Sequence, residues 1–160
     1  MDYTENFEKL CKKWEGCELK AYKDAAGVWT IAYGHTGDDV YEGLEITQAQ
    51  ADALFEKDAA KHCKALNKRL DLLGIALNQN RFDAVLDMVY NLGVDMVLPV
   101  NKKDKPSTFC GALCAGNYAK AAEYMLTFNK ITDPKTGKKV EKKGLTNRRK
   151  AERELFVKEA

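Results

Sequence analysis

The chain has few of the residues that build metal centres or disulfide frameworks. It has 160 residues, among them two histidines, His35 and His62, and five cysteines. Two imidazoles exclude a zinc site made of several histidines, and the sequence contains neither the His-Glu-x-x-His pattern nor a glycine-rich phosphate-binding loop. An odd number of cysteines excludes a complete disulfide scaffold and fits synthesis in a reducing compartment. We therefore expect no metal and no other cofactor.

The cysteines give no clear site of their own. Cys110 and Cys114 are one helical turn apart, a spacing that also suits two metal ligands. Two cysteines on an apolar helix face are more often simple packing, because a free cysteine behaves as a small hydrophobic residue. We assign them no function.

Long apolar runs and a secretion signal are also missing. No stretch is apolar for long enough to span a bilayer, and residues 1–6 carry acid where a signal peptide carries base. We expect a protein made in the cytoplasm without a signal peptide and without stable membrane insertion. Action outside the cell then requires release through a separate membrane-permeabilising factor.

The charge is distributed unevenly along the chain. Residues 130–160 hold 11 Lys and Arg against five Asp and Glu, which is +6 and leaves −4 for residues 1–129 out of a net +2. A basic tail suits an anionic polymer such as nucleic acid or bacterial wall, and a solvated surface is the alternative interpretation. Binding of single-stranded nucleic acid usually needs aromatic stacking platforms among the basic residues, and Phe156 is the one aromatic residue in this tail. We therefore expect no nucleic-acid partner.

Hydrophobic periodicity predicts an α+β protein that is mostly helical. Apolar residues at helical spacing over positions 7–14, with Thr4 before them and Gly16 after, predict a first helix. A turn at 24–27 followed by alternating β-branched and aromatic residues over 28–33 predicts a small antiparallel hairpin.

The rest of the chain predicts further helices. Thr47 and Gln50 form a capping box that opens a helix reaching about Leu70, long enough to join two lobes. An apolar helix is predicted over 82–90 and ends at Gly93. Two short helices, Thr108–Ala115 and Tyr118–Thr127, are predicted with Ser107 and Asn117 as their caps. A lysine-rich loop over 129–143 then leads to a last helix from Asn147 to Lys158, which packs through Ala151, Leu155 and Phe156. We expect one domain over residues 1–160, with a small sheet-bearing lobe at about 14–60. Residues 61–160 and the N-terminal helix then form a larger helical lobe.

Glu15 is a candidate acid because of its place at the end of the first helix. A carboxylate at the negative end of the helix dipole costs stability, and the dipole together with burial against Trp14 would raise its pKa. A raised pKa is what a general acid needs to hold a proton near neutral pH. An exposed glutamate at a frayed helix end is the alternative interpretation.

Asp24 and Thr30 are candidate partners of Glu15 on the hairpin. Asp24 opens the turn that Gly27 closes, where aspartate is also common for structural reasons. Thr30 is on the strand face opposite Trp29 and Ile31, so its hydroxyl is expected to point into a cleft. Two carboxylates and a hydroxyl within 16 residues suit acetal hydrolysis, in which one acid protonates the leaving oxygen and the other activates water.

Three segments of the chain resemble the T4-like family of phage-type lysozymes, or endolysins. Residues 15–36 resemble the family's catalytic segment, residues 81–93 its buried helix and residues 144–152 its C-terminal helix, in the family's order. Ala32 departs from the glycine usual at its position, and the loop over 129–143 looks longer and more basic than usual.

The resemblance implies a glycoside hydrolase with a lysozyme-like fold that cleaves bacterial peptidoglycan as a monomer. It makes Glu15 the proton donor, Asp24 the carboxylate on the water side and Thr30 the residue that positions the water, while His35 ties the strand to the body of the protein. Inversion at the sugar is expected, since a water lies between substrate and Asp24. A lytic transglycosylase on the same fold is one alternative, and the presence of both Asp24 and Thr30 argues against it. A non-catalytic wall-binding protein is the other, and intact Glu15, Asp24 and Thr30 argue against that.

Overall fold

The chain opens with a helix whose two ends are set by single residues. In the computed structural model, which describes residues 1–159, helix α1 spans Glu5–Glu15. The Thr4 hydroxyl oxygen accepts a hydrogen bond from the backbone N–H of Asn6, and Gly16 ends the helix with a φ of 65°. The first predicted helix is confirmed, and Glu15 is its last residue.

A three-stranded antiparallel sheet follows the helix. Strands β1 (Glu18–Lys23), β2 (Trp29–Ala32) and β3 (His35–Thr36) are arranged in the order β1-β2-β3. Tyr22 lies opposite Thr30 across the β1–β2 pair. The predicted hairpin is confirmed, and its turn falls at residues 24–27.

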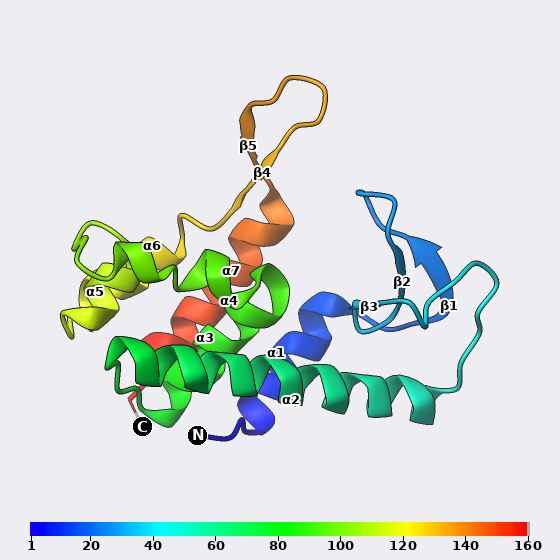
Figure 1. The fold of residues 1–160 in the computed structure, drawn as a ribbon, viewed down its shortest axis with the longest axis horizontal. Coiled ribbons are helices and arrows are strands. Elements are labelled where there is room, and N and C mark those ends of the chain that lie inside the picture. The colour runs from blue at the N-terminus through cyan, green and yellow to red at the C-terminus, as the bar shows by residue number, and fades with distance from the viewer. Residues whose placement is uncertain (160) are drawn as a thin grey trace.

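Helix α2 (Gln48–Leu73) runs from the sheet region to the helical region and spans both lobes (Figure 1). The capping box predicted at its start is present: the Thr47 side chain accepts from the backbone of Gln50, and the Gln50 side chain accepts from the backbone of Thr47. The helix ends three residues beyond the predicted Leu70, where Gly74 adopts the left-handed conformation.

The larger lobe is built around helix α3 (Gln79–Leu92), which contacts α1, α2 and the last helix, α7 (Lys143–Val157). Every residue from Phe82 to Val89 is buried, including the acids Asp83 and Asp87. The remaining elements are α4 (Val94–Val97), the 3₁₀ turn η1 (Val100–Lys102), α5 (Phe109–Cys114), α6 (Tyr118–Met125) and strands β4 (Lys130–Thr132) and β5 (Lys139–Glu141). The predicted α+β, mostly helical architecture with a small antiparallel sheet is confirmed, whereas the lobe boundary near residue 60 stays a prediction.

Three local predictions in the C-terminal half are wrong. Thr108, not Ser107, caps α5, because its hydroxyl oxygen accepts from the backbone N–H of Gly111 at 3.0 Å. The predicted loop over 129–143 contains the β4–β5 hairpin, which projects from the helical lobe (Figure 1). Helix α7 begins at Lys143 instead of Asn147; no side-chain cap marks its start, so the sequence carries no signal for it.

Ala32 sits where the chain turns out of β2. Its φ of 56° lies in the left-handed region, which an alanine enters at a cost of roughly 1–2 kcal/mol. The unusual replacement of glycine at this position is therefore a source of local strain. Within residues 1–159, no helix is both long and apolar enough to cross a membrane.

Candidate active site

Glu15 ends α1 inside the protein and not on a frayed tip. Its side chain keeps only 16% of its surface exposed. One carboxylate oxygen, Oε1, accepts a hydrogen bond from Nη1 of Arg148 at 2.7 Å. The other, Oε2, lies so close to Gly34 that a Cβ placed there would be 2.6 Å away. Glu15 is thus held between α7 and the turn that follows β2.

The surroundings of Glu15 favour the protonated form. Burial raises the pKa of its carboxyl group, and the positive charge and hydrogen bond of Arg148 oppose this without cancelling it. Asp87 adds a further negative charge that raises the pKa. A carboxylic acid with a raised pKa and some exposed surface has the properties of a general acid.

Asp24 is fixed at the tip of the β1–β2 hairpin. Its Oδ1 accepts hydrogen bonds from the backbone N–H groups of Ala26 and Val28, each at 2.9 Å. Within the described part of the chain, Oδ2 accepts no such bond and so is open to water. The turn-capping role expected of Asp24 is confirmed, and it leaves one exposed carboxylate oxygen for chemistry.

Thr30 lies on β2, one strand away from Asp24. It is 4% exposed, and its hydroxyl donates to the backbone oxygen of Val28 at 2.9 Å. The hydroxyl proton therefore already takes part in a hydrogen bond, while the oxygen keeps lone pairs that can accept a hydrogen bond from a water molecule. Whether the hydroxyl borders a cleft stays a prediction.

Tyr22 connects the two candidate carboxylates electrostatically. Burial first, and then the negative charges of Glu15, Glu18 and Asp24, raise the pKa of its phenol. The negative charges of both Glu15 and Asp24 thus contribute to the raised pKa of this phenol.

His35 joins the sheet to the long helix. Its Nδ1 is 2.7 Å from Oδ2 of Asp58 on α2, and its Nε2 is 3.0 Å from both carboxylate oxygens of Asp39. Burial lowers the pKa of His35, but the hydrogen bonds to Asp58 and Asp39 outweigh this and the net shift is upward. The structural role expected for His35 is confirmed.

Two residues that hold Glu15 were not singled out from the sequence. Arg148 and Gly34 are 133 and 19 positions away from it along the chain. A signal for Arg148 existed: it is one of two consecutive arginines in the last helix, next to the apolar packing positions. Gly34 gave no comparable signal, because the close approach depends on the path of the turn.

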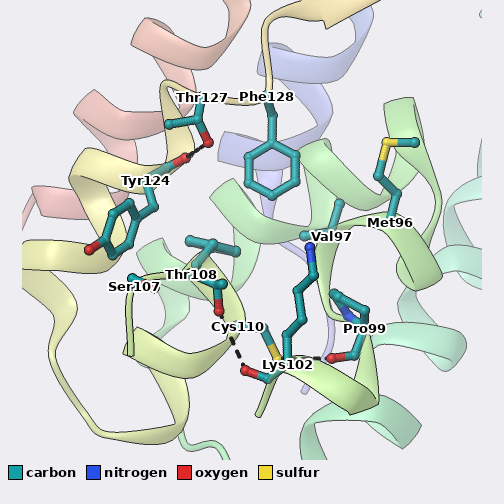
Figure 2. Close-up of a pocket in the computed structure, with 11 residues that line it drawn as sticks. Met96, Val97, Pro99, Lys102, Ser107, Thr108, Cys110, Tyr124, Thr127 and Phe128 are labelled. Atoms are coloured by element: carbon teal, nitrogen blue, oxygen red, sulfur yellow. Dashed lines mark hydrogen bonds between the residues drawn. The ribbon is translucent and has the colours of Figure 1, made fainter. Parts of the chain in front are cut away.

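Neither a metal cluster nor the hollow on the larger lobe offers an alternative centre among the described residues. Within residues 1–159, no group of three or more His, Cys, Asp or Glu is placed to hold a metal ion. A hollow of about 430 Å³ lies on the larger lobe, and Figure 2 shows Lys102 extending into it toward Phe128. Its lining includes no carboxylate, so it has no acid for hydrolysis.

Comparison with known proteins identifies the family of the chain. Residues 12–152 match the phage lysozyme family, and that span contains Glu15, Asp24, Thr30 and Arg148. The chain belongs to the phage lysozyme family. It is a glycoside hydrolase that degrades peptidoglycan.

Relatives of this lysozyme cover nearly all of its length. It is 35% identical over 156 residues to an endolysin of Acyrthosiphon pisum secondary endosymbiont phage 1, covering 98% of each chain. The solved endolysin of Escherichia coli O157:H7 phage FAHEc1 is 36% identical with a TM-score of 0.81, covering 98% of this chain and 94% of that one. The muramidase domain of SpmX from Asticaccaulis excentricus is 26% identical with the same TM-score and covers 99% of each chain.

Proposed function

We propose that this lysozyme is an N-acetylmuramidase that cleaves the β-1,4 bond between N-acetylmuramic acid and N-acetylglucosamine. Glu15 is the proton donor, Asp24 the carboxylate that activates water and Thr30 the residue that positions the water. The observation that carries the proposal is the environment of Glu15, a largely buried carboxyl group with a raised pKa beside a hairpin that bears a second, exposed carboxylate.

In the proposed reaction Glu15 gives its proton to the glycosidic oxygen as the bond from that oxygen to the anomeric carbon breaks. A water attacks the anomeric carbon, and Oδ2 of Asp24 removes a proton from it. The Thr30 oxygen accepts a hydrogen bond from the same water. Transfer of one proton from Asp24 to solvent and of one from solvent to Glu15 restores the enzyme.

Attack by water from the face opposite the leaving group gives inversion at the anomeric carbon. Inverting enzymes separate their two carboxyl groups by about 6.5–9.5 Å, which leaves space for the water. Asp24 lies at the tip of the β1–β2 hairpin and Glu15 at the end of α1, so the reaction needs the substrate and the water to lie between these two elements.

The test is mass spectrometry of the fragments that the protein releases from purified peptidoglycan. We expect reducing muramic acid ends from the wild type, loss of these fragments with Glu15→Gln, and full activity with Glu18→Gln. Glu18 is the matched control because it is an exposed glutamate three residues further along.

The other outcomes of this experiment identify the alternatives. Anhydro-muramic ends would show a lytic transglycosylase and remove the role given to Asp24. Absence of fragments from walls of several types would show a wall-binding protein. Unchanged activity of Glu15→Gln would overturn the assignment of the acid.

We also propose that the enzyme is a monomer, is made in the cytoplasm, and reaches the wall through a separate membrane-permeabilising factor. The relatives named as endolysins support the part of this proposal that concerns release to the wall. Cells that express the protein should remain intact until their membrane is permeabilised with chloroform and should then lyse rapidly. Lysis without permeabilisation, or a dimer in light scattering, would contradict the corresponding part.

A further inference from the structure

Behind Glu15 lies a buried cluster of charged side chains that the proposed reaction does not use directly. Three helices contribute to it: Glu15 comes from α1, Asp87 from α3, and Arg148, Arg149 and Glu152 from α7. Asp87, Arg149 and Glu152 are fully buried and Arg148 is 5% exposed. Charges at this depth are stable only when they are paired and hydrogen-bonded, so each of these side chains must have a partner.

Asp87 holds Arg148 by two hydrogen bonds. Nε of Arg148 donates to Oδ2 and Nη2 donates to Oδ1, each at 2.9 Å. Such a bidentate pair fixes the plane of the guanidinium as well as its position. The remaining terminal nitrogen, Nη1, is thereby aimed at Glu15, to which it donates at 2.7 Å.

Glu152 has one oxygen that is satisfied and one that is not. Oε1 accepts from Nη2 of Arg149 at 2.5 Å, whereas Oε2 is buried without a donor in the described part of the chain. If all three acids were ionised, three carboxylates would face two guanidinium groups. A proton on Glu152 balances the charges and gives Oε2 a hydrogen to donate toward Asp87, the nearby carboxylate whose charge raises the pKa of Glu152.

We propose that Asp87, with the proton it shares with Glu152, is a positioning residue of the lysozyme reaction: it clamps Arg148 and offsets its charge, so that Arg148 orients Glu15 without preventing Glu15 from carrying a proton. The inference rests on the proposed function, in which Glu15 is the acid. Asp87 itself does not touch the substrate.

The directions of the pKa shifts agree with this arrangement. Burial raises the pKa of Glu152, and its hydrogen bond to Asp87 raises it further, which favours the protonated form. Hydrogen bonds from Arg148 and Glu152 hold the pKa of Asp87 below its usual range although burial opposes this. The negative charge of Asp87 in turn raises the pKa of Glu15.

Other titratable groups near Glu15 keep one charge state across the working range. Burial raises the pKa of both Cys11 on α1 and Tyr90 on α3, so both stay neutral. Tyr22 on β1 also has a raised pKa. Asp87 and Glu152 are therefore the acids whose charges decide how strongly Arg148 acts on Glu15.

The inference is tested by carbon-13 NMR titration of the side-chain carboxyl groups of Glu15 and Glu152. In the wild type we expect Glu152 to show the protonated form at neutral pH. Glu152→Gln keeps a neutral group there and should leave the titration of Glu15 nearly unchanged. Adding Asp87→Asn to that variant leaves two guanidinium groups facing Glu15 alone, so its midpoint should move to lower pH.

Activity gives a second readout. The alkaline limb of the kcat/KM profile should move with the Glu15 midpoint, and activity above the limb should fall about tenfold per pH unit of movement. Asp83→Asn is the matched control, since Asp83 is a buried acid on the same helix that hydrogen-bonds to Thr4 and Gln79. This control should leave the Glu15 midpoint in place.

Two results would overturn the inference: an ionised Glu152 at neutral pH in the wild type, or an unmoved Glu15 midpoint in the double variant. The first needs no substitution, so it stands even if the double variant does not fold. Either result leaves the proposed function intact. Retained activity of Glu15→Gln would instead overturn the proposed function, whatever the titrations show.

Discussion

At the scale of single residues, Gly34 controls the position of Glu15. Its φ of 81° favours glycine, and a Cβ there would meet Oε2 of Glu15 at 2.6 Å, closer than non-bonded atoms approach. Gly34→Ala should therefore displace the carboxyl group and lower kcat/KM by about a hundredfold. The measurement is the rate of peptidoglycan hydrolysis by protein whose fold is verified by circular dichroism.

Gly74→Ala is the control for backbone strain at Gly34. Gly74 also has a positive φ, 68°, but no atom lies within 4 Å of a Cβ built on it. Its substitution should cost roughly 1–2 kcal/mol of stability and leave kcat/KM unchanged. Equal activity of the Gly34 and Gly74 variants would show that contact with Gly34 does not place Glu15.

The candidate acids could be predicted from the sequence because local structure marks them. Glu15 is the last residue of a helix and Asp24 is the first residue of a turn, and neighbouring residues in the sequence indicate both features. Asp87 and Arg148 are 61 positions apart, so only tertiary packing reveals their pairing. Asp83 and Asp87 in the most apolar helix were nevertheless a signal, since a buried acid requires a partner.

At the scale of elements, predictions succeeded where a cap or turn signal was strong. The capping box gave the start of α2, and Gly16 and Gly93 gave the ends of α1 and α3. The β4 and β5 strands have three residues each and every one of them is exposed, so no alternation between buried and exposed positions marks them. The sequence therefore predicted only a lysine-rich loop over 129–143.

The contact between β3 and α2 should depend on pH through His35. Its pKa is raised in the folded protein, so the stabilisation is complete below the unfolded value of about 6.5 and is lost as pH rises through the folded pKa. Asp58→Asn should therefore lower the free energy of unfolding more at about pH 5.5 than at about pH 8, since these values lie below and above the ordinary histidine pKa of about 6.5. Urea unfolding at both pH values measures this difference.

Asp71→Asn is the control for the Asp58 variant. Asp71 is an exposed carboxylate on the same helix, and no ion pair joins it to another described residue. Its substitution should change stability by the same small amount at both pH values. An Asp58→Asn penalty that is constant with pH would show that His35 is not charged in the folded protein.

At the scale of the whole molecule, the basic tail divides into a buried part and an exposed part. Arg148 and Arg149 are buried and paired with acids, so they add little to the surface field. The exposed positive charge is concentrated on the projecting β4–β5 hairpin and the start of α7 (Figure 1). This surface can attract an anionic wall from a distance set by the Debye length, about 10 Å at 0.1 M salt.

Neutralising that surface should weaken lysis mainly at low ionic strength. The variant changes four exposed lysines to glutamine: Lys138, Lys139, Lys142 and Lys143. Its activity on whole walls should fall below that of the wild type at about 0.01 M salt and approach it at about 1 M, where the Debye length is about 3 Å. Turbidity loss of wall suspensions across this range gives the comparison.

A second variant separates local charge from net charge. It changes four exposed lysines of α2 to glutamine: Lys57, Lys61, Lys64 and Lys68. Net charge falls by the same four units, so an effect of net charge alone would appear equally in both variants. A larger loss at low salt in the hairpin variant would place wall attraction on the hairpin and the start of α7, while equal activity of that variant and the wild type at every ionic strength would remove this role.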